Sequence, residues 1–486
     1  MENNVKFRNH VSIILEKSLK TIGTVLAIFF FNLISETEET GIKSGDIVFL
    51  VVIFVVVLAA ALGFQALIWA KTYISIEENT LVVERNTINK KRNTIGLKNI
   101  SNVNLEQNLL EMVLGTCKVK LDTNSLSTAD ETDVNIVLKK ADAEKFRMWV
   151  LAKAEGRDVN EAISTETAET ELSSNKGNRI IGRTSDIILH GVFSIHIWMI
   201  VLFFGIMVIQ IWMMADLGME ELGETIIEIF ASLFVAFYFA AIILWRIVKE
   251  FIKYLNFQID RKKDKVYLSY GYFKKVAYSV PVDKINGIRL SQTPLARMGK
   301  RYMVEIINVG MDDDENEMNT FFLPYNKLET IKSQLHMILP EFDGALEIKE
   351  EKQPAAIWLL SFPWWLLYVV LVVVTYILAG TYSEDSELKY AIIFAAAVIA
   401  VWRFIAKVAE FFTKGIKVDA KFLKIVDGRF ARRVLFVKYD KIQYVTGRQC
   451  VIAKHFKIQK GTISLLASLK NRIHEFHISR KVTWNS

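Results

Sequence analysis

Apolar and polar positions occur in alternating blocks along the chain, and the same order of blocks is found three times. In each repeat, two neighbouring apolar stretches precede a polar segment in which apolar residues recur at every second position. A helix needs about 20 mostly apolar residues to cross about 30 Å of hydrocarbon. Four stretches meet that length: Ile47 to Ala70, Ile187 to Ala215, Thr225 to Trp245 and Ala355 to Ala379. The shorter stretches Thr21 to Ser35 and Ala391 to Trp402 complete the pairs, so the pattern predicts six transmembrane helices in three hairpins.

The polar segments have the pattern of antiparallel strands. Val266, Leu268 and Tyr270 alternate with their neighbours, and turn residues interrupt such runs every eight to twelve positions. The first two repeats then end in stretches of helical periodicity, over 141–153 and 327–339. These features predict, after each hairpin, a small barrel or strongly bent sheet that a helix closes in repeats 1 and 2.

A short signature recurs with equal spacing in all three polar segments. The sequences GLKNI, PVDKI and YDKI end at Ile100, Ile285 and Ile442, and a glutamine follows seven residues later, at Gln107, Gln292 and Gln449. A basic cluster precedes each signature: Lys90, Lys91 and Arg92, then Lys274 and Lys275, then Arg432 and Arg433. Equal spacing in three copies indicates one ancestral module in tandem.

The predicted organisation assigns nearly the whole chain. The hairpins occupy 1–71, 187–254 and 354–413, the strand-rich domains occupy 72–155, 255–341 and 414–486, and 156–186 is a flexible linker rich in Glu, Thr and Ser. The short hairpin turns are acidic and the opposite ends are basic, which places both termini and all three domains in the cytoplasm. The expected location is therefore the cytoplasmic (inner) membrane, crossed several times.

Composition and charge refine this picture. Hydrophobic residues make up 52% of the chain, and the two cysteines, Cys117 and Cys450, lack the spacing of a disulfide framework or a thiolate metal site. The segment 415–486 contains 16 Lys and Arg against 4 Asp and Glu, a net charge of +12 against +7 for the whole chain. Such a surface fits nonspecific contact with anionic lipid, a defined headgroup or acidic-ligand site, or a plain solvated face. The candidate contacts for anionic lipid or a partner are Arg429, Arg432, Arg433, Lys438, Lys454, Lys274, Lys275, Lys90, Lys91 and Arg92.

The order of strands, basic turn, signature and closing helix resembles the bacterial membrane-bound pleckstrin-homology-like (PH-like) domain family, and its threefold repetition resembles the YdbT type of that family. The resemblance implies a split β-barrel for each module, an integral membrane protein and no established catalytic activity. It also implies a protein partner, for which a shorter single-domain relative is the candidate. Repeat 3 departs from the pattern, because Lys454 and His455 replace the expected glycine and no closing helix follows. We expect another part of the protein or a partner to cover its open end.

No sequence motif indicates an enzyme, a cofactor, a metal site or a nucleic-acid partner. The predicted function is a non-enzymatic membrane scaffold whose domains contact proteins and the inner leaflet. One alternative is a lipid-handling or transport protein that uses the helical bundle, with Glu228, His190 and His196 as the polar residues along its path. Another is a headgroup-binding component of an envelope stress response.

Overall fold

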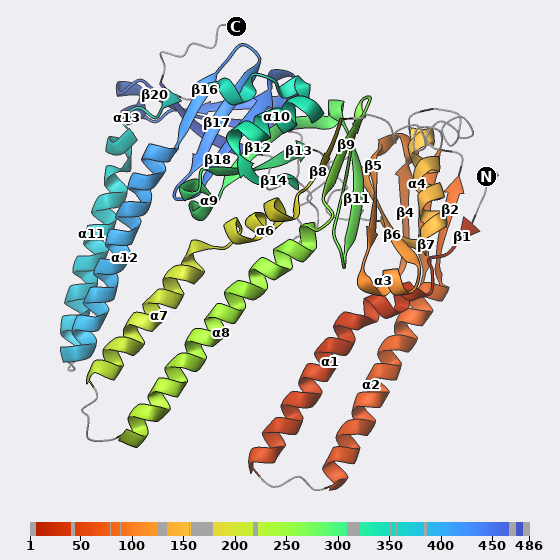
Figure 1. Ribbon diagram of the computed structural model, residues 1–486, viewed down its shortest axis with the longest axis horizontal. Coiled ribbons are helices and arrows are strands. Elements are labelled where there is room, and N and C mark those ends of the chain that lie inside the picture. The colour runs from red at the N-terminus through yellow and green to blue at the C-terminus, as the bar shows by residue number, and fades with distance from the viewer. Residues whose placement is uncertain are drawn as a thin grey trace. The chain divides into compact units, whose positions relative to one another are not determined.

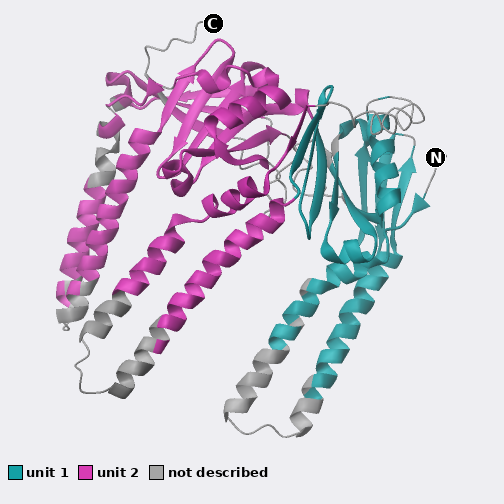
Figure 2. Cartoon of the chain, in the orientation of Figure 1, with its two compact units in different colours: residues 1–177, 256–280 teal, residues 178–255, 281–486 magenta. Residues whose placement is uncertain are grey.

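The computed structural model describes residues 6–39, 44–77, 79–87, 89–123, 134–154, 156, 178–216, 222–308, 321–349, 351–355, 357–382, 386–465 and 473–479. The chain forms two compact units, shown in Figure 2. The first comprises residues 1–177 and 256–280, and the second comprises residues 178–255 and 281–486. Each polar segment with its helices is called a repeat below, numbered in chain order.

The first unit contains repeat 1 and the opening strands of repeat 2. Its helices are α1 (Ser12–Glu39), α2 (Ser44–Ala70), α3 (Leu109–Val113), α4 (Lys140–Ala154) and the 3-10 turn η1 (Leu97–Asn99). One antiparallel sheet has the order β1 (Lys6–Phe7), β2 (Thr72–Glu77), β3 (Thr80–Asn86), β4 (Lys90–Gly96). In the other, repeat 1 contributes β5 (Ile100–Gln107), β6 (Thr116–Thr123) and β7 (Val134–Lys139), and repeat 2 contributes β9 (Gln258–Lys262), β10 (Lys265–Tyr270) and β11 (Lys275–Pro281).

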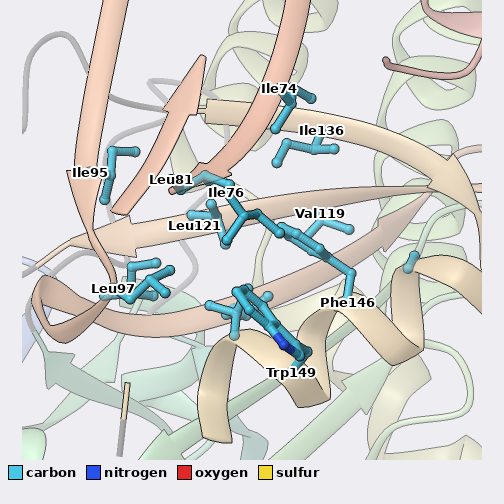
Figure 3. Close-up of a cluster of buried hydrophobic side chains, with 14 of the residues drawn as sticks. Ile74, Ile76, Leu81, Ile95, Leu97, Val119, Leu121, Ile136, Phe146 and Trp149 are labelled. Atoms are coloured by element: carbon cyan, nitrogen blue, oxygen red, sulfur yellow. The ribbon is translucent and has the colours of Figure 1, made fainter. Parts of the chain in front are cut away.

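The core of repeat 1 lies between its two sheets and α4 (Figure 3). Ile74 and Leu81 from the first sheet are buried together with Val119 from the second. Phe146 and Trp149 project from α4 into the same cluster. Successive side chains of a strand point to opposite faces of the sheet. Apolar residues at every second position of the sequence therefore lie together on the face that forms this core.

The second unit contains the rest of repeat 2 and all of repeat 3, whose labelled helices and strands can be followed in Figure 1. Its α-helices are α6 (Thr184–Phe193), α7 (Ile197–Asp216), α8 (Leu222–Tyr254), α9 (Pro294–Met298), α10 (Leu328–Ile338), α11 (Ile357–Tyr382), α12 (Ser386–Thr413) and α13 (Val451–His455). Its 3-10 turns are η2 (Val282–Lys284), η3 (Pro340–Phe342), η4 (Ala345–Glu347) and η5 (Tyr439–Lys441).

One antiparallel sheet joins the two repeats of this unit. Its order is β14 (Phe321–Lys327), β13 (Arg301–Asn308), β12 (Ile285–Gln292), β18 (Arg432–Lys438), β17 (Phe422–Gly428), β16 (Gly415–Val418), β15 (Glu351–Lys352). Repeat 3 ends in a separate sheet of β19 (Ile442–Arg448), β20 (Ile458–Leu465) and β21 (Ile473–Ser479). Ile463 and Phe476 of that sheet pack on Leu435 of β18 and on Ile307 of repeat 2.

The prediction of six transmembrane helices in three hairpins is wrong. Among the described residues, two helices are long and apolar enough to cross a membrane, through Val51–Ala70 and Ile392–Thr413. The number reaches three only if α6 and α7, which meet at a bend of 60°, form one span. The sheets also continue from one repeat into the next, which the prediction of separate domains did not include.

The apolar run Ile187 to Ala215 begins with residues that belong to a strand-rich repeat. The helix α6 packs on β14, and its Ile187 and His190 are buried in repeat 2. The first turns of α1, before the predicted stretch Thr21 to Ser35, pack on repeat 1, where Glu16 pairs with Lys118. In α11 the described apolar stretch is limited to Leu366–Leu378.

Part of the predicted linker 156–186 can be compared with the structure. Residues 157–177 lie outside the described residues. The remaining part forms the short strand β8 (Asn178–Ile181) and the start of α6 at Thr184. In β8, Asn178 donates a hydrogen bond to the carbonyl oxygen of Met337, with 2.9 Å between the atoms.

Candidate functional site: the seams between consecutive repeats

The candidate site is the pairing of a strand in one repeat with a strand of the next, which we call a seam. In the first seam, β5 of repeat 1 pairs antiparallel with β11 of repeat 2. Opposite residues are Gln107 and Lys275, and next to them Glu106 and Val276. The basic cluster of repeat 2 therefore lies against the signature glutamine of repeat 1.

The second seam repeats this arrangement between β12 and β18. Gln292 lies opposite Arg432, and the ladder continues through six residue pairs to Gly287 opposite Val437. Every residue of β12 is buried. The register is the same as in the first seam, because Gln292 and Arg432 occupy the positions of Gln107 and Lys275 in the repeat. The register of two paired strands is strongly specified where a face of the sheet is buried, because a shift by one residue would move the buried side chains to the other face.

The structure explains the recurring signature. The residues before the isoleucine form the 3-10 turns η1, η2 and η5, each of which leads directly into the strand that starts with that isoleucine. The glutamine at the far end donates from Nε2 to a carbonyl oxygen nine residues later in all three repeats. The acceptors are Thr116 at 2.8 Å, Arg301 at 2.9 Å and Ile458 at 2.7 Å. Each bond closes the chain around the short helix that follows the strand.

Charges are paired inside the first seam. Glu106 is buried, and its carboxylate lies 3.1 Å from the Nζ of Lys120 and 3.2 Å from the Nζ of Lys274. Lys274 comes from repeat 2, so this ion pair joins the two repeats. Removing one partner of a buried ion pair leaves an uncompensated charge and is strongly destabilising.

The second seam has a buried polar cluster at the corresponding place. Ser291, at the position of Glu106, donates to the carboxylate of Glu305 over 2.8 Å, and Arg289 lies 3.5 Å from the same oxygen. At Gly287 the strands approach closely, since a β-carbon there would lie 2.6 Å from the carbonyl oxygen of Phe436. Only glycine allows this approach without moving β18.

The structure separates the predicted contact residues into three groups. Lys274, Lys275, Arg432 and Arg433 belong to the two seams. Lys90, Lys91 and Arg92 occupy the same repeat position on β4, where they are exposed. The others lie in repeat 3 outside the seam: Arg429 pairs with Glu410 over 3.2 Å, Lys438 lies over the ring of Phe342, and Lys454 is exposed on α13. The structure does not bring these residues together into one site.

A cavity of about 380 Å³ at the end of α12 was not predicted from the sequence. Its lining combines apolar side chains with two arginines: Pro294, Arg297, Met298, Ala409, Phe412, Thr413, Arg429 and Phe430. Arg297 of repeat 2 donates across it to the hydroxyl of Thr413 over 3.1 Å and to the carbonyl oxygen of Arg429 over 3.3 Å. Arg297 therefore holds the β17–β18 turn of repeat 3.

The charges near this cavity are largely compensated. Glu410 lies 2.8 Å from the Nζ of Lys414 and 3.2 Å from the Nε of Arg429. Burial alone would lower the pKa of Lys414, but its bonds to Glu410 and Asp427 outweigh burial and raise the pKa.

The cysteines and acidic residues offer no metal site within the described part of the chain, where no group of three His, Cys, Asp or Glu could hold an ion. Cys117 is buried in repeat 1, and burial raises the pKa of its thiol to about 12. Cys450 is exposed directly after the signature glutamine of repeat 3.

Comparison with known proteins identifies the repeating unit. A family model described as "Bacterial PH domain" matches residues 25–154, 198–337 and 356–479. The chain belongs to the bacterial PH domain family. Each match begins in or just before a helix of a hairpin and ends in or near the last helix or strand of a repeat, so the unit of this family includes helices as well as the PH domain.

One curated relative gives the family a membrane context. The chain is 21% identical over 340 residues to the UPF0699 transmembrane protein YdbT of Bacillus subtilis (strain 168). The match covers 67% of this chain and 66% of that protein, just under two thirds of its length. No solved structure matches the chain. Together with the two apolar helices, these findings indicate a membrane-associated protein with tandem PH domains.

Proposed function

We propose that this protein is a membrane scaffold, in which tandem PH domains joined by shared sheets present an assembly surface beside the membrane. The observation that carries this proposal is the identical register of the two seams. A flexible tether would hold neighbouring domains together but would leave their angle free. A continuous sheet fixes the angle and the register of the strands that it joins.

The seams support a way in which one PH domain could recognise another. The contact uses main-chain hydrogen bonds along an edge strand, and the side chains at the end of the strand provide selectivity, as Glu106 and Lys274 do in the first seam. We expect the protein partner to contribute the same kind of edge. A shorter single-domain relative remains the candidate, because it would contain such a strand.

The test of the scaffold is crosslinking in native membranes, followed by purification in mild detergent and identification of bound protein and lipid. The account predicts a protein partner in fixed stoichiometry, crosslinked to the PH domains. Recovery of the lone monomer under conditions that preserve other membrane complexes would contradict it. A stoichiometric lipid without a protein would favour the second candidate function.

The second candidate is contact with anionic lipid at the end of α12. Arg429 and Phe430 line the cavity there, and Trp402 of the apolar helix stacks on Phe430 with 5.1 Å between the ring centroids. Aromatic and basic side chains at the end of an apolar helix are typical of the membrane interface. These contacts favour headgroup binding more than transport.

The transport alternative loses one of its polar residues. His190 is buried in repeat 2 among the rings of Tyr254, Phe321 and Tyr325, and the main-chain N–H of Tyr325 lies 3.4 Å from its Nδ1. The exposed His196 lies at the bend between α6 and α7, and the side chain of Glu228 is outside the described residues.

Lipid contact is tested by measuring the phosphatidylglycerol retained by the purified full-length chain. Arg429→Gln should lower the retained lipid, whereas Lys421→Gln removes the same charge from an exposed position outside the cavity lining and should not. Equal retention by both variants would show that the charge of repeat 3 acts without a defined site.

A further inference from the structure

The strand β19 occupies the seam position of repeat 3 and has an open edge. In repeats 1 and 2 the strand that follows the signature, β5 or β12, pairs on one side within its repeat and on the other with the next repeat. Among the described strands, β19 pairs with β20 alone. Its Tyr444 is 49% exposed and its Val445 is 46% exposed. An apolar edge of this kind is a ready template for another strand.

The two seams predict how a strand would pair with β19. Gln449 corresponds to Gln107 and Gln292 and would lie opposite the first residue of the incoming strand. Arg448 would lie opposite the second residue of the incoming strand. Lys454 corresponds to Arg297, which binds the turn before the incoming strand in the second seam, and it is exposed on α13.

The charge of this edge distinguishes it from the seams. Arg448 occupies the position of Glu106 and Ser291, and its neighbour across the sheet is Lys460. Repeat 3 as a whole has a net charge of +12. In the first seam Lys274, directly before the incoming strand β11, pairs with Glu106, while the residue opposite Glu106 is Val276. At β19 an arginine takes the place of the glutamate, so the partner should bring an acidic residue to it.

A second copy of the chain is a poor occupant. The strand equivalent to β11 and β18 is β4, which is an edge strand of its sheet. In the seam register β4 would place Lys91 opposite Arg448, with Lys90 and Arg92 beside it. Like charges directly opposite each other destabilise a strand pair. The charges of β4 and β19 therefore oppose head-to-tail polymerisation, which a heterologous contact between these two edges would otherwise allow.

We propose that β19 docks an edge strand of a different protein, with an acidic residue opposite Arg448, and so extends the row of seams to a partner. This inference rests on the proposed scaffold function and names the chemistry of its partner. Tyr444 of β19 occupies the repeat position of Gly287 in β12. Its side chain prevents an incoming strand from approaching as closely as β18 approaches Gly287 in the second seam. We expect a short ladder around Gly447, Arg448 and Gln449, like the three residue pairs of the first seam.

The experiment converts β4 into an acidic strand and uses full-length chains throughout. The variant Lys90→Glu/Lys91→Glu keeps its fold, because Lys91 faces Arg85 within its own sheet and the substitution gives that pair opposite charges. Wild-type chain carrying one tag should capture this variant at least about tenfold more tightly than it captures a second wild-type chain. The gain should disappear when the capturing chain carries Arg448→Glu, and it should remain with Lys421→Glu, an exposed lysine of repeat 3 outside β19.

Disulfide trapping tests the register. In a Cys450→Ser background, a capturing chain with Thr446→Cys should crosslink to a charge-reversed chain with Asn93→Cys, because these positions are opposite in the seam register. The control with Asn86→Cys places the thiol on β3, one strand further from the edge, and should not crosslink.

The following results would overturn the proposal. Wild-type chains that capture each other as tightly as they capture the variant would make a second copy the occupant. Capture that persists with Arg448→Glu, or a crosslink only to position 86, would move the contact away from the edge. If Arg448→Glu instead weakened binding to phosphatidylglycerol vesicles and left capture unchanged, the edge would meet a membrane. If crosslinks to a protein partner in native membranes persisted with Arg448→Glu, the proposed scaffold function would stand and only the proposed docking at β19 would be ruled out.

Discussion

The strands β12 and β19 occupy the same place in consecutive repeats and have opposite surroundings. Both follow a 3-10 turn and both end next to a glutamine that binds a carbonyl oxygen nine residues later. All residues of β12 are buried, whereas no residue of β19 is. The difference arises because β18 covers one strand and no described strand covers the outer edge of the other. The 3-10 turn, the strand and the glutamine hydrogen bond therefore form with or without a second strand on the outer edge. The second strand decides whether the residues of the first are buried or exposed.

The largest effect should come from breaking the ion pair of the first seam. Glu106→Gln leaves Lys120 and Lys274 without their carboxylate, and the free energy of unfolding of the first unit should fall by about 3 kcal/mol. Chemical denaturation of the full-length chain measures this change. Glu84→Gln removes an equivalent carboxylate from a more exposed pair with Arg92 and should cost less than about 1 kcal/mol. Equal losses would mean that the first seam is not a buried contact.

The second seam can be compared with the open edge at a single repeat position. Gly287→Val forces a side chain against the carbonyl oxygen of Phe436 and should lower the stability of the second unit by about 2 kcal/mol. Tyr444→Val, at the same position in β19, changes an exposed side chain and should stay within about 0.5 kcal/mol. A large effect of Tyr444→Val would show that β19 is covered in the isolated chain.

The reactivity of the two cysteines compares a buried position with an exposed one in the native chain, without any substitution. Cys450 is exposed and should react with a maleimide in the native chain, while Cys117 should react only after unfolding. Mass spectrometry of the labelled chain measures both. Reaction of Cys117 in the native chain would contradict its burial in the core of repeat 1.

The thiol of Cys117 also predicts a dependence on pH. Its folded pKa of about 12 lies above the ordinary value of 9.0, so the folded state favours the protonated thiol. This contribution to stability is fully present below pH 9 and is lost as the pH rises from 9 towards 12, by about 1.4 kcal/mol per pH unit. Denaturation at pH 8 and pH 10.5 should show a smaller loss for Cys117→Ala than for the wild-type chain. An equal loss in both would assign the pH dependence to other groups.

The sequence predicts those parts of the fold that depend on local patterns. The alternation in β10, the helical periodicity that becomes α4 and α10, and the equal spacing that ends at Gln107, Gln292 and Gln449 all follow from residues close together in the chain. The family could be named from that order alone. The seams could not be predicted, because the pairing of β5 with β11 joins residues far apart in the chain, and strand alternation does not specify which edge meets which.

The membrane prediction failed for a related reason. Ile187 to Ala215 reads as one apolar span, but its first part is α6, which packs on β14 and is bent by 60° from α7. An apolar run shows that residues avoid water and does not show whether lipid or protein covers them. The candidate contact residues were found by charge, and charge alone did not distinguish Lys274 and Arg432, which belong to seams, from Lys91, which is exposed.

Hydrogen exchange of the main-chain amides is the sharpest test of the pairing of β12 and β19, because it compares both strands in one unmodified chain. Peptides covering 285–292 should exchange at least about tenfold more slowly than peptides covering 442–448, since β12 is paired on both sides and, among the described strands, β19 on one. In the presence of the Lys90→Glu/Lys91→Glu variant, exchange at 442–448 should slow and exchange at 285–292 should not change. Equal protection of the two strands in the isolated wild-type chain would contradict the account, because it would mean that β19 already has a partner or that β12 has none.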